Sequence, residues 1–150
     1  MQPLFHHNRI NILDEIVAWA GAEPVIRPAY RALQPEDVYE LGKMKLIEFG
    51  AHTVTHPFLA GHSTASQWEE IYQSKIQLEK ILKNPVQSFS YPHGNYTTET
   101  VSLVQKAGFN CACSTSAGVV SKHSKLFQLP RCQVQDCSGE EFAKWWQSRF

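Results

Sequence analysis

Two segments of the chain carry apolar residues at the three- and four-residue spacing of an amphipathic helix. The first covers residues 8–20, and Gly21 follows it as a residue that commonly ends a helix. The second covers residues 66–83 and is ended by the Asn84-Pro85 pair. The apolar positions are Ile10, Leu13, Val17 and Ala20 in the first segment, and Trp68, Ile71, Leu78 and Leu82 in the second.

Three further helices are predicted from their start signals. Pro35 suits the first turn of a short helix, and two acidic residues follow it where the helix dipole favours negative charge. Thr97 or Thr98 can cap a helix that runs to Lys106. Ser138 and Glu141 have the spacing of a capping box, which predicts a last helix after them.

Short apolar runs between these helices predict strands at residues 46–51, 86–91, 109–114 and 127–134. The last run contains Pro130, which places it at an edge or an end of the sheet. Strand and helix therefore alternate from residue 35 onward, and residues 22–34 form an irregular connection. This alternation predicts an α/β fold with parallel strands and helices outside, in one domain of residues 1–150 with a helical and irregular lead-in over 1–34.

The stretch from Leu46 to Pro57 holds the strongest candidate chemistry, two histidines four residues apart. Three β-branched residues between the histidines, and the proline after His56, disfavour a helix there. A fully extended segment would separate the two rings by about 13 Å, too far for one metal ion held at roughly 2.0–2.1 Å. If His52 and His56 share an ion, the chain must curl between them. The alternative is one exposed histidine and one hydrogen-bonded loop histidine.

Candidate site residues recur where the predicted strands end. His52 and His56 follow the first strand, His93 follows the second within a Pro-His-Gly-Asn turn, and Arg131 lies in the last. Active groups of α/β folds gather at the carboxyl ends of the strands. We therefore expect these side chains to face one another.

The balance of charge argues against several classes of partner. The 14 basic and 14 acidic residues give no electrostatic case for nucleic acid or an anionic membrane. No apolar run reaches the ~20 residues of a membrane span. The first residues lack a basic region followed by an apolar one, so we expect no secretory signal and a cytoplasmic location. The cysteines show no zinc-binding spacing and are expected to be buried free thiols in a reducing compartment: Cys111, Cys113, Cys132 and Cys137.

Four motifs in the same order resemble the NodB-homology polysaccharide deacetylases, carbohydrate esterase family 4. Gly50-Ala51-His52-Thr53-Val54-Thr55-His56-Pro57 resembles the metal-binding H-[ST]-x-x-H motif, and Phe89-Ser90-Tyr91-Pro92-His93-Gly94 resembles the F-x-Y-P-Y-G loop. Ala107-Gly108-Phe109 and Leu129-Pro130-Arg131 resemble the following helix-to-strand step and the late L-P-R strand. The resemblance covers roughly residues 35–135.

The resemblance also implies what is absent. The family's first motif, T-F-D-D-G, supplies a catalytic-base Asp and a metal-binding Asp, and the chain contains no Asp-Asp pair. His93 stands where the family usually has Tyr, and Ser90 where many members have Arg. We therefore expect a partial, irregular (β/α) barrel of the polysaccharide deacetylase type that lacks its first strands.

Carried over residue by residue, the resemblance implies a metal site and a reaction. His52 and His56 would bind a divalent ion, with Zn expected first and Co, Ni or Fe as alternatives, and the site could stay empty without its Asp ligand. His93 would donate its N–H to the oxyanion, and Arg131 would orient the base or form a structural ion pair. Tyr91, Pro92 and His93 would wall the substrate, although the ring of Tyr91 is also a core candidate.

Two functions of different classes follow from these expectations. The first is metal-dependent hydrolysis of N-acetyl or O-acetyl groups on a polysaccharide or oligosaccharide, completed by a partner. The second is a catalytically incomplete module that binds glycan or protein or associates with itself. Open sheet edges need covering, so we expect a homodimer or a rearranged lead-in of residues 1–34.

Overall fold

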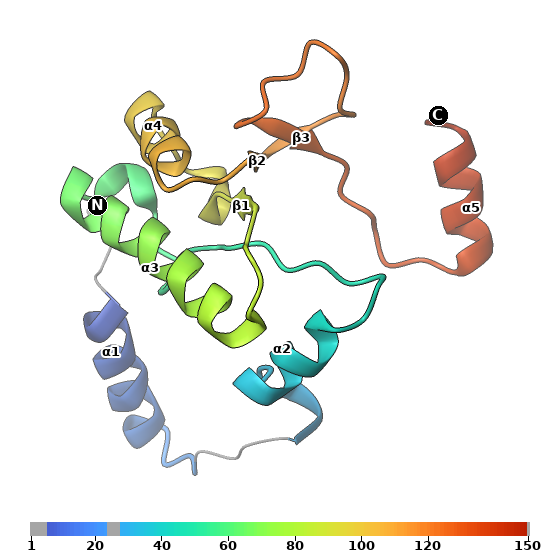
Figure 1. Cartoon of the computed structure of the whole chain (residues 1–150). Helices are drawn as coiled ribbons and strands as arrows, with labels where there is room; N and C mark the ends of the chain where they lie inside the picture. The colour runs from blue at the N-terminus through green and yellow to red at the C-terminus, as the bar shows by residue number, and fades with distance from the viewer. Residues whose placement is uncertain (1–5, 24–27, 150) are drawn as a thin grey trace.

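A computed structural model describes residues 6–23 and 28–149 of the chain (Figure 1). The predicted alternation of helices and strands is confirmed except for the first predicted strand, and the other boundaries differ by a few residues. The elements in order are α1 (His6–Trp19), η1 (Pro28–Tyr30), α2 (Pro35–Gly42), η2 (Leu59–Gly61), α3 (Thr64–Leu82), β1 (Ser88–Ser90), η3 (Pro92–Gly94), α4 (Thr98–Lys106), β2 (Cys111–Ala117), β3 (Leu129–Arg131) and α5 (Gly139–Gln147).

The three strands form a parallel sheet in the order β1-β2-β3. Ala51 adds an isolated parallel bridge beside Phe89, because its N–H donates to Ser88 O and its carbonyl accepts from Ser90 N–H, both at 2.9 Å. The chain segments that follow Ala51 and β1 therefore both leave the sheet at its carboxyl end. The predicted α/β class with parallel strands is confirmed, and Pro130 lies in β3 at the end of the strand order, as expected.

The strand predicted over residues 46–51 is wrong except at its last residue. Residues 47–50 form no ladder, and Leu46 and Ile47 are 99% and 38% exposed. Gly50 passes close to β1, since a Cβ on it would lie 2.6 Å from Ser88 Oγ. Within the described residues no further strand pairs on the outer side of this segment, where Leu46 and Ile47 stay exposed while Phe49 is half-buried.

The core lies between the sheet, α3 and α4. Phe89 and Tyr91 are fully buried with their rings 5.4 Å apart, and Ile71 of α3 and Val104 of α4 are buried with them. The polar contact between the two helices is also buried, because Thr100 donates its hydroxyl to Gln67 Oε1 at 2.6 Å. These contacts fix α3 against the strand that precedes η3.

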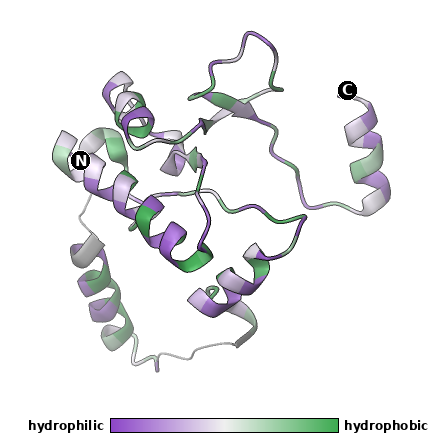
Figure 2. Ribbon diagram, in the orientation of Figure 1, coloured by the Kyte–Doolittle hydropathy of each residue, from purple (hydrophilic) through white to green (hydrophobic). Residues whose placement is uncertain are grey.

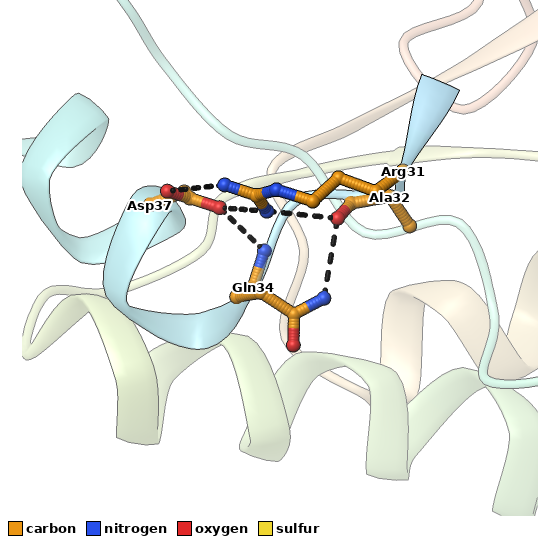
Figure 3. A network of polar contacts seen from close by, with 4 residues as sticks. All are labelled: Arg31, Ala32, Gln34 and Asp37. Atoms are coloured by element: carbon orange, nitrogen blue, oxygen red, sulfur yellow. Dashed lines mark hydrogen bonds and ion pairs between the residues drawn. The ribbon is translucent and has the colours of Figure 1, made fainter. Parts of the chain in front are cut away.

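The predicted caps at Thr97 and Ser138 are confirmed, and Ser63, a cap not predicted from the sequence, begins α3. Ser63, Thr97 and Ser138 each accept a hydrogen bond from a backbone N–H in the first turn of α3, α4 and α5. At α2, Asp37 accepts from the N–H of Gln34 at 2.8 Å and from both terminal nitrogens of Arg31 (Figure 3). This network ties the irregular segment before α2 to its first turn.

The terminal helices α1 and α5 lie at the periphery of the molecule (Figure 1), and both carry apolar residues there (Figure 2). The apolar residues of α1 are more exposed than expected of an amphipathic helix packed on a core, with Leu13 55% and Trp19 89% exposed. In α5, Phe142 and Trp146 are also exposed. None of the helices in the described ranges combines the length and apolarity needed to cross a membrane.

Candidate active site

The loop between Ala51 and Pro57 brings its two histidine rings into contact. The ring centroids of His52 and His56 lie 4.8 Å apart at an interplanar angle of 65°. Thr53 and His56 both have positive φ, 64° and 57°, so the chain curls as two histidines on one ion require. Two imidazoles bound to one tetrahedral ion at about 2.0–2.1 Å have ring centres roughly 5 Å apart, which agrees with the observed separation.

Two side chains hold this curl, because positive φ at a non-glycine residue costs on the order of 1–3 kcal/mol. The hydroxyl of Thr53 donates to His52 O at 2.6 Å and accepts from His56 N–H at 3.1 Å. Glu70 of α3 accepts three hydrogen bonds from residues 54 and 55. Glu70 was not identified from the sequence, because no local pattern reveals a contact between a helix and a loop 15 residues before it.

The orientation of the His52 ring is set by β1. Its Nδ1 lies 2.7 Å from the carbonyl oxygen of Ser90, which can only accept, so Nδ1 carries the proton. The lone pair of neutral His52 is therefore on Nε2. A backbone acceptor on the far nitrogen is the usual arrangement for a metal-binding histidine.

His56 is biased towards its neutral form. Desolvation has the largest lowering effect on the pKa of His56. The neighbouring rings of His52 and His93 lower this pKa further, because each is a potential positive charge. A neutral imidazole keeps a lone pair, and only that form binds a metal ion.

The turn after β1 carries His93 against the same loop. Its ring centroid is 4.4 Å from that of His56 and 4.0 Å from that of Phe58, on which it stacks at 7°. Asn95 adds a second link, since its side-chain oxygen accepts from Ala60 N–H at 2.8 Å. The structure thus brings His52, His56 and His93 together, as expected from their places at strand ends.

The backbone of this turn is as distinctive as its side chains. His93 has φ 57° and Gly94 φ 63°, and a Cβ on Gly94 would collide with Thr115 of β2. Within the described part of the chain, the N–H of His93 donates to no acceptor, whereas the next two N–H groups bond to Tyr91 O and Pro92 O. A free N–H beside the histidines is available to stabilise an oxyanion.

The other proposed substrate residues lie deeper. Tyr91 is 0% exposed and donates its hydroxyl to Phe127 O at 2.9 Å, and burial raises its pKa well above the usual range. Pro92 is buried as well. Both residues support the turn from beneath, and their side chains do not reach the surface at which His93 is exposed.

Arg131 is exposed at the end of β3 and donates from Nε to Ser114 O at 2.8 Å. Together with Thr115, Cys132 and Gln133 it lines a cavity of about 300 Å³. Thr115 also contacts the Gly94 position, so this cavity lies next to the His93 turn. No ion pair of Arg131 occurs with any described residue.

Comparison with known proteins decides the family. The sequence profile of the family described as polysaccharide deacetylase matches residues 16–112, which include His52, His56 and His93. The chain belongs to the polysaccharide deacetylase family. A curated relative, "Putative polysaccharide deacetylase YxkH" of Bacillus subtilis (strain 168), is 28% identical over 103 residues, which are 68% of this chain and 37% of that protein.

Solved structures of polysaccharide deacetylases and deacetylases share the fold. The Streptococcus pyogenes deacetylase PplD, solved in complex with acetate, is 25% identical with a TM-score of 0.70 over 78% of this chain and 52% of that one. A Bacillus cereus polysaccharide deacetylase is 23% identical with a TM-score of 0.67 over 89% and 46%. The chain spans about half the length of these proteins, or less in the case of the curated relative.

The donor atoms of this deacetylase-family chain meet part of the requirement for a metal site. His52 and His56 have the right separation, the Nδ1 contact sets the tautomer of His52, and the lowered pKa of His56 favours its neutral form. The described residues contain no group of three His, Cys, Asp or Glu side chains that could hold an ion, so Asp136 supplies no third ligand. The buried hydroxyl of Ser90, next to the His52 contact, forms no hydrogen bond with any described group. The four cysteines are free thiols, but the expectation that they are buried is wrong, because Cys111, Cys113 and Cys132 are only half-buried and Cys137 is exposed.

Proposed function

We propose that this chain provides the two-histidine part of a metal-dependent deacetylase site that removes N-acetyl or O-acetyl groups from a polysaccharide or oligosaccharide. The observation that carries the proposal is the His52–His56 ring contact, with Nδ1 of His52 fixed on Ser90 O. Membership of the polysaccharide deacetylase family supports the substrate class. We expect Zn first, with Co, Ni or Fe as alternatives.

The residues of the chain would divide the work as follows. His52 and His56 would hold the ion through one ring nitrogen each. A divalent ion bound there would act as a Lewis acid on the acetyl carbonyl and lower the pKa of the attacking water. The N–H of His93 would donate to the oxygen of the acetyl group as negative charge develops on it. Arg131, beside the neighbouring cavity, would orient the catalytic carboxylate.

The carboxylates of the reaction would come from a partner. No described acidic residue joins the two histidines in a metal-binding group. Two neutral ligands make a weak site, and a third, anionic ligand would both raise the affinity and complete the coordination. We place the missing ligand and the general base on a second polypeptide, which can be another copy of this chain.

A non-catalytic role is the second candidate. The absence of a third donor among the described residues favours it. Such a module would bind glycan or protein, or associate with itself, and the histidines would serve only to shape the surface. The two candidates differ in metal uptake and turnover.

Zinc titration of the intact chain by calorimetry separates them. We expect one zinc site of modest affinity that is lost in His52→Ala and in His56→Ala. His123→Ala is the matched control, because His123 is exposed in the loop between β2 and β3 and makes no ring contact with the described residues. Zinc uptake that His52→Ala leaves unchanged would refute the site.

Release of free amine from an acetylated chito-oligosaccharide is then measured with zinc present. Turnover by the chain alone would show that a second copy is sufficient. Zinc binding without turnover is the expected result if a different polypeptide supplies the carboxylates. If the chain shows no zinc binding and no turnover, the non-catalytic module is the better description.

A further inference from the structure

We propose that Glu70 is the positioning residue of this site: it holds the backbone between His52 and His56 in the shape that places both rings on one side. The inference rests on the proposed function, because it concerns the histidines assigned there as metal ligands. Glu70 touches neither ring in this role. It acts through residues 54 and 55, which separate them.

Both carboxylate oxygens of Glu70 are used on the loop. Oε2 accepts from the N–H groups of Val54 and Thr55, each at 2.8 Å, and Oε1 accepts from the Thr55 hydroxyl at 2.6 Å. One ionised side chain thus binds two consecutive backbone donors and a side-chain donor. Hydrogen bonds to an ionised acceptor are stronger than those between neutral groups, and three of them fix position as well as orientation.

The helix that carries Glu70 is firmly placed. Ile71, the next residue of α3, is fully buried in the core, and Ser63 caps the start of the helix. Gln67, one turn before Ile71, is buried and bonded to Thr100 of α4. A carboxylate on such a helix is a fixed reference point for a loop that has no regular structure of its own.

The loop needs such a support from outside. Thr53 and His56 hold positive φ, and the local contacts of Thr53 reach only His52 and His56. Arg9 of α1 adds one hydrogen bond to Thr55 O at 2.8 Å. Without Glu70, the N–H groups of residues 54 and 55 would turn to water, and the segment would relax towards the extended form in which the two rings separate.

Four variants test the inference. Glu70→Ala removes all three hydrogen bonds, and Glu70→Gln keeps one acceptor oxygen. Thr55→Val removes only the hydroxyl contact. Glu69→Gln is the matched control, because Glu69 is the adjacent, exposed carboxylate of α3 and bonds to no described residue. Circular dichroism tests whether each variant is folded. If Glu70→Ala does not fold, Glu70→Gln and Thr55→Val are used for the two measurements described next.

The first readout needs no metal. Proton NMR follows the cross-peak between the His52 and His56 rings and the hydrogen exchange of the Val54 and Thr55 amides. We expect Glu70→Ala to lose the cross-peak and the protection, Glu70→Gln to weaken both, and Glu69→Gln to retain both. A cross-peak and amide protection that persist in Glu70→Ala would overturn the positioning role.

The second readout is the zinc dissociation constant. Loss of a residue that orients metal ligands typically weakens metal binding by roughly 10–100-fold, and we expect Glu70→Ala to fall in that range with Glu70→Gln between it and wild type. Equal affinities in Glu70→Ala and Glu69→Gln would also overturn the inference. If wild type takes up no zinc, the proposed function fails, whereas the metal-free NMR measurement still decides the role of Glu70.

Discussion

The chemistry of the candidate site depends on a few residues in backbone conformations that most side chains avoid. Thr53, His56 and His93 all have positive φ, and Gly94 follows His93 with the same sign. Such conformations persist only where surrounding contacts determine them, and they often mark functional sites. Here the contacts come from Thr53 itself, from Glu70, and from Phe58 stacked on His93.

The pKa of His56 should rise when His93 is removed. Desolvation, His52 and His93 all lower this pKa, in that order of size. His93→Ala removes one potential positive charge and uncovers part of the His56 ring, so the pKa should move up towards its ordinary value of 6.5. NMR titration of the His56 ring protons measures the shift. His123→Ala is the control, and an unchanged pKa in His93→Ala would contradict the assignment of causes.

Gly94→Ala should destabilise the protein more than Gly108→Ala. Both glycines have positive φ, 63° and 79°, so each alanine incurs backbone strain of about 1–2 kcal/mol. A Cβ at position 108 meets nothing within 4 Å, whereas at position 94 it lies 2.8 Å from Thr115 Cβ. We expect this clash to add about 1–3 kcal/mol. Equal free energies of unfolding by urea titration would mean that β2 can move away from the turn.

At the scale of elements, the sequence predicts helices better than strands. The caps at Ser63, Thr97 and Ser138 are local signals, and each predicted helix begins within a few residues of its observed start. Strands depend on neighbours that are distant in sequence. The segment 46–50 has a strand-like pattern and forms no ladder, while β1 is only three residues long and β2 begins later than predicted.

The contact of α3 with the start of β1 predicts an acid-sensitive stability. Partial burial raises the pKa of Glu79, but the hydrogen bond from Val86 N–H and the ammonium of Lys75 lower it more, so the net pKa is below 4.5. A carboxylate with a depressed folded-state pKa stabilises the fold above its unfolded pKa, and this contribution is lost as the pH falls through the folded value.

Glu79→Gln should therefore unfold more easily at neutral pH, by about 1 kcal/mol, and show a shallower loss of stability below pH 4.5 than wild type. Urea titrations at a series of pH values between neutral and strongly acid measure both effects. Glu69→Gln, on the same helix but exposed, should follow the wild-type profile. A Glu79→Gln profile parallel to wild type would show that the carboxylate does not contribute the acid dependence.

At the scale of the whole molecule, the class of fold and the meeting of three histidines were predictable, and the surroundings of the site were not. His52, His56 and His93 follow segments that leave the sheet at its carboxyl end, and parallel strands place such residues together. The role of Glu70 depends on how α3 packs against a loop, which sequence periodicity does not encode. The exposure of α1 and of residues 46–47 was also not predictable, because burial depends on what lies beside them.

Self-association is the prediction that belongs to this scale. Leu46 is 99% exposed beside a segment whose outer side carries no strand within the described residues, and Met44 and Ile47 are exposed next to it. Apolar side chains beside an open backbone edge favour pairing with another chain. We expect sedimentation velocity to show an average mass that rises with protein concentration. A second copy at this edge would lie next to His52, where the site lacks a carboxylate.

Leu46→Lys should weaken that association, because a charge at the edge must be desolvated when a second chain pairs there. Leu126→Lys is the matched control, since Leu126 is 62% exposed in the loop between β2 and β3. If both variants lower the association equally, the effect is one of net charge and the edge is not the interface. If neither does, this edge is not the interface, and a second copy bound here does not supply the carboxylate that completes the site.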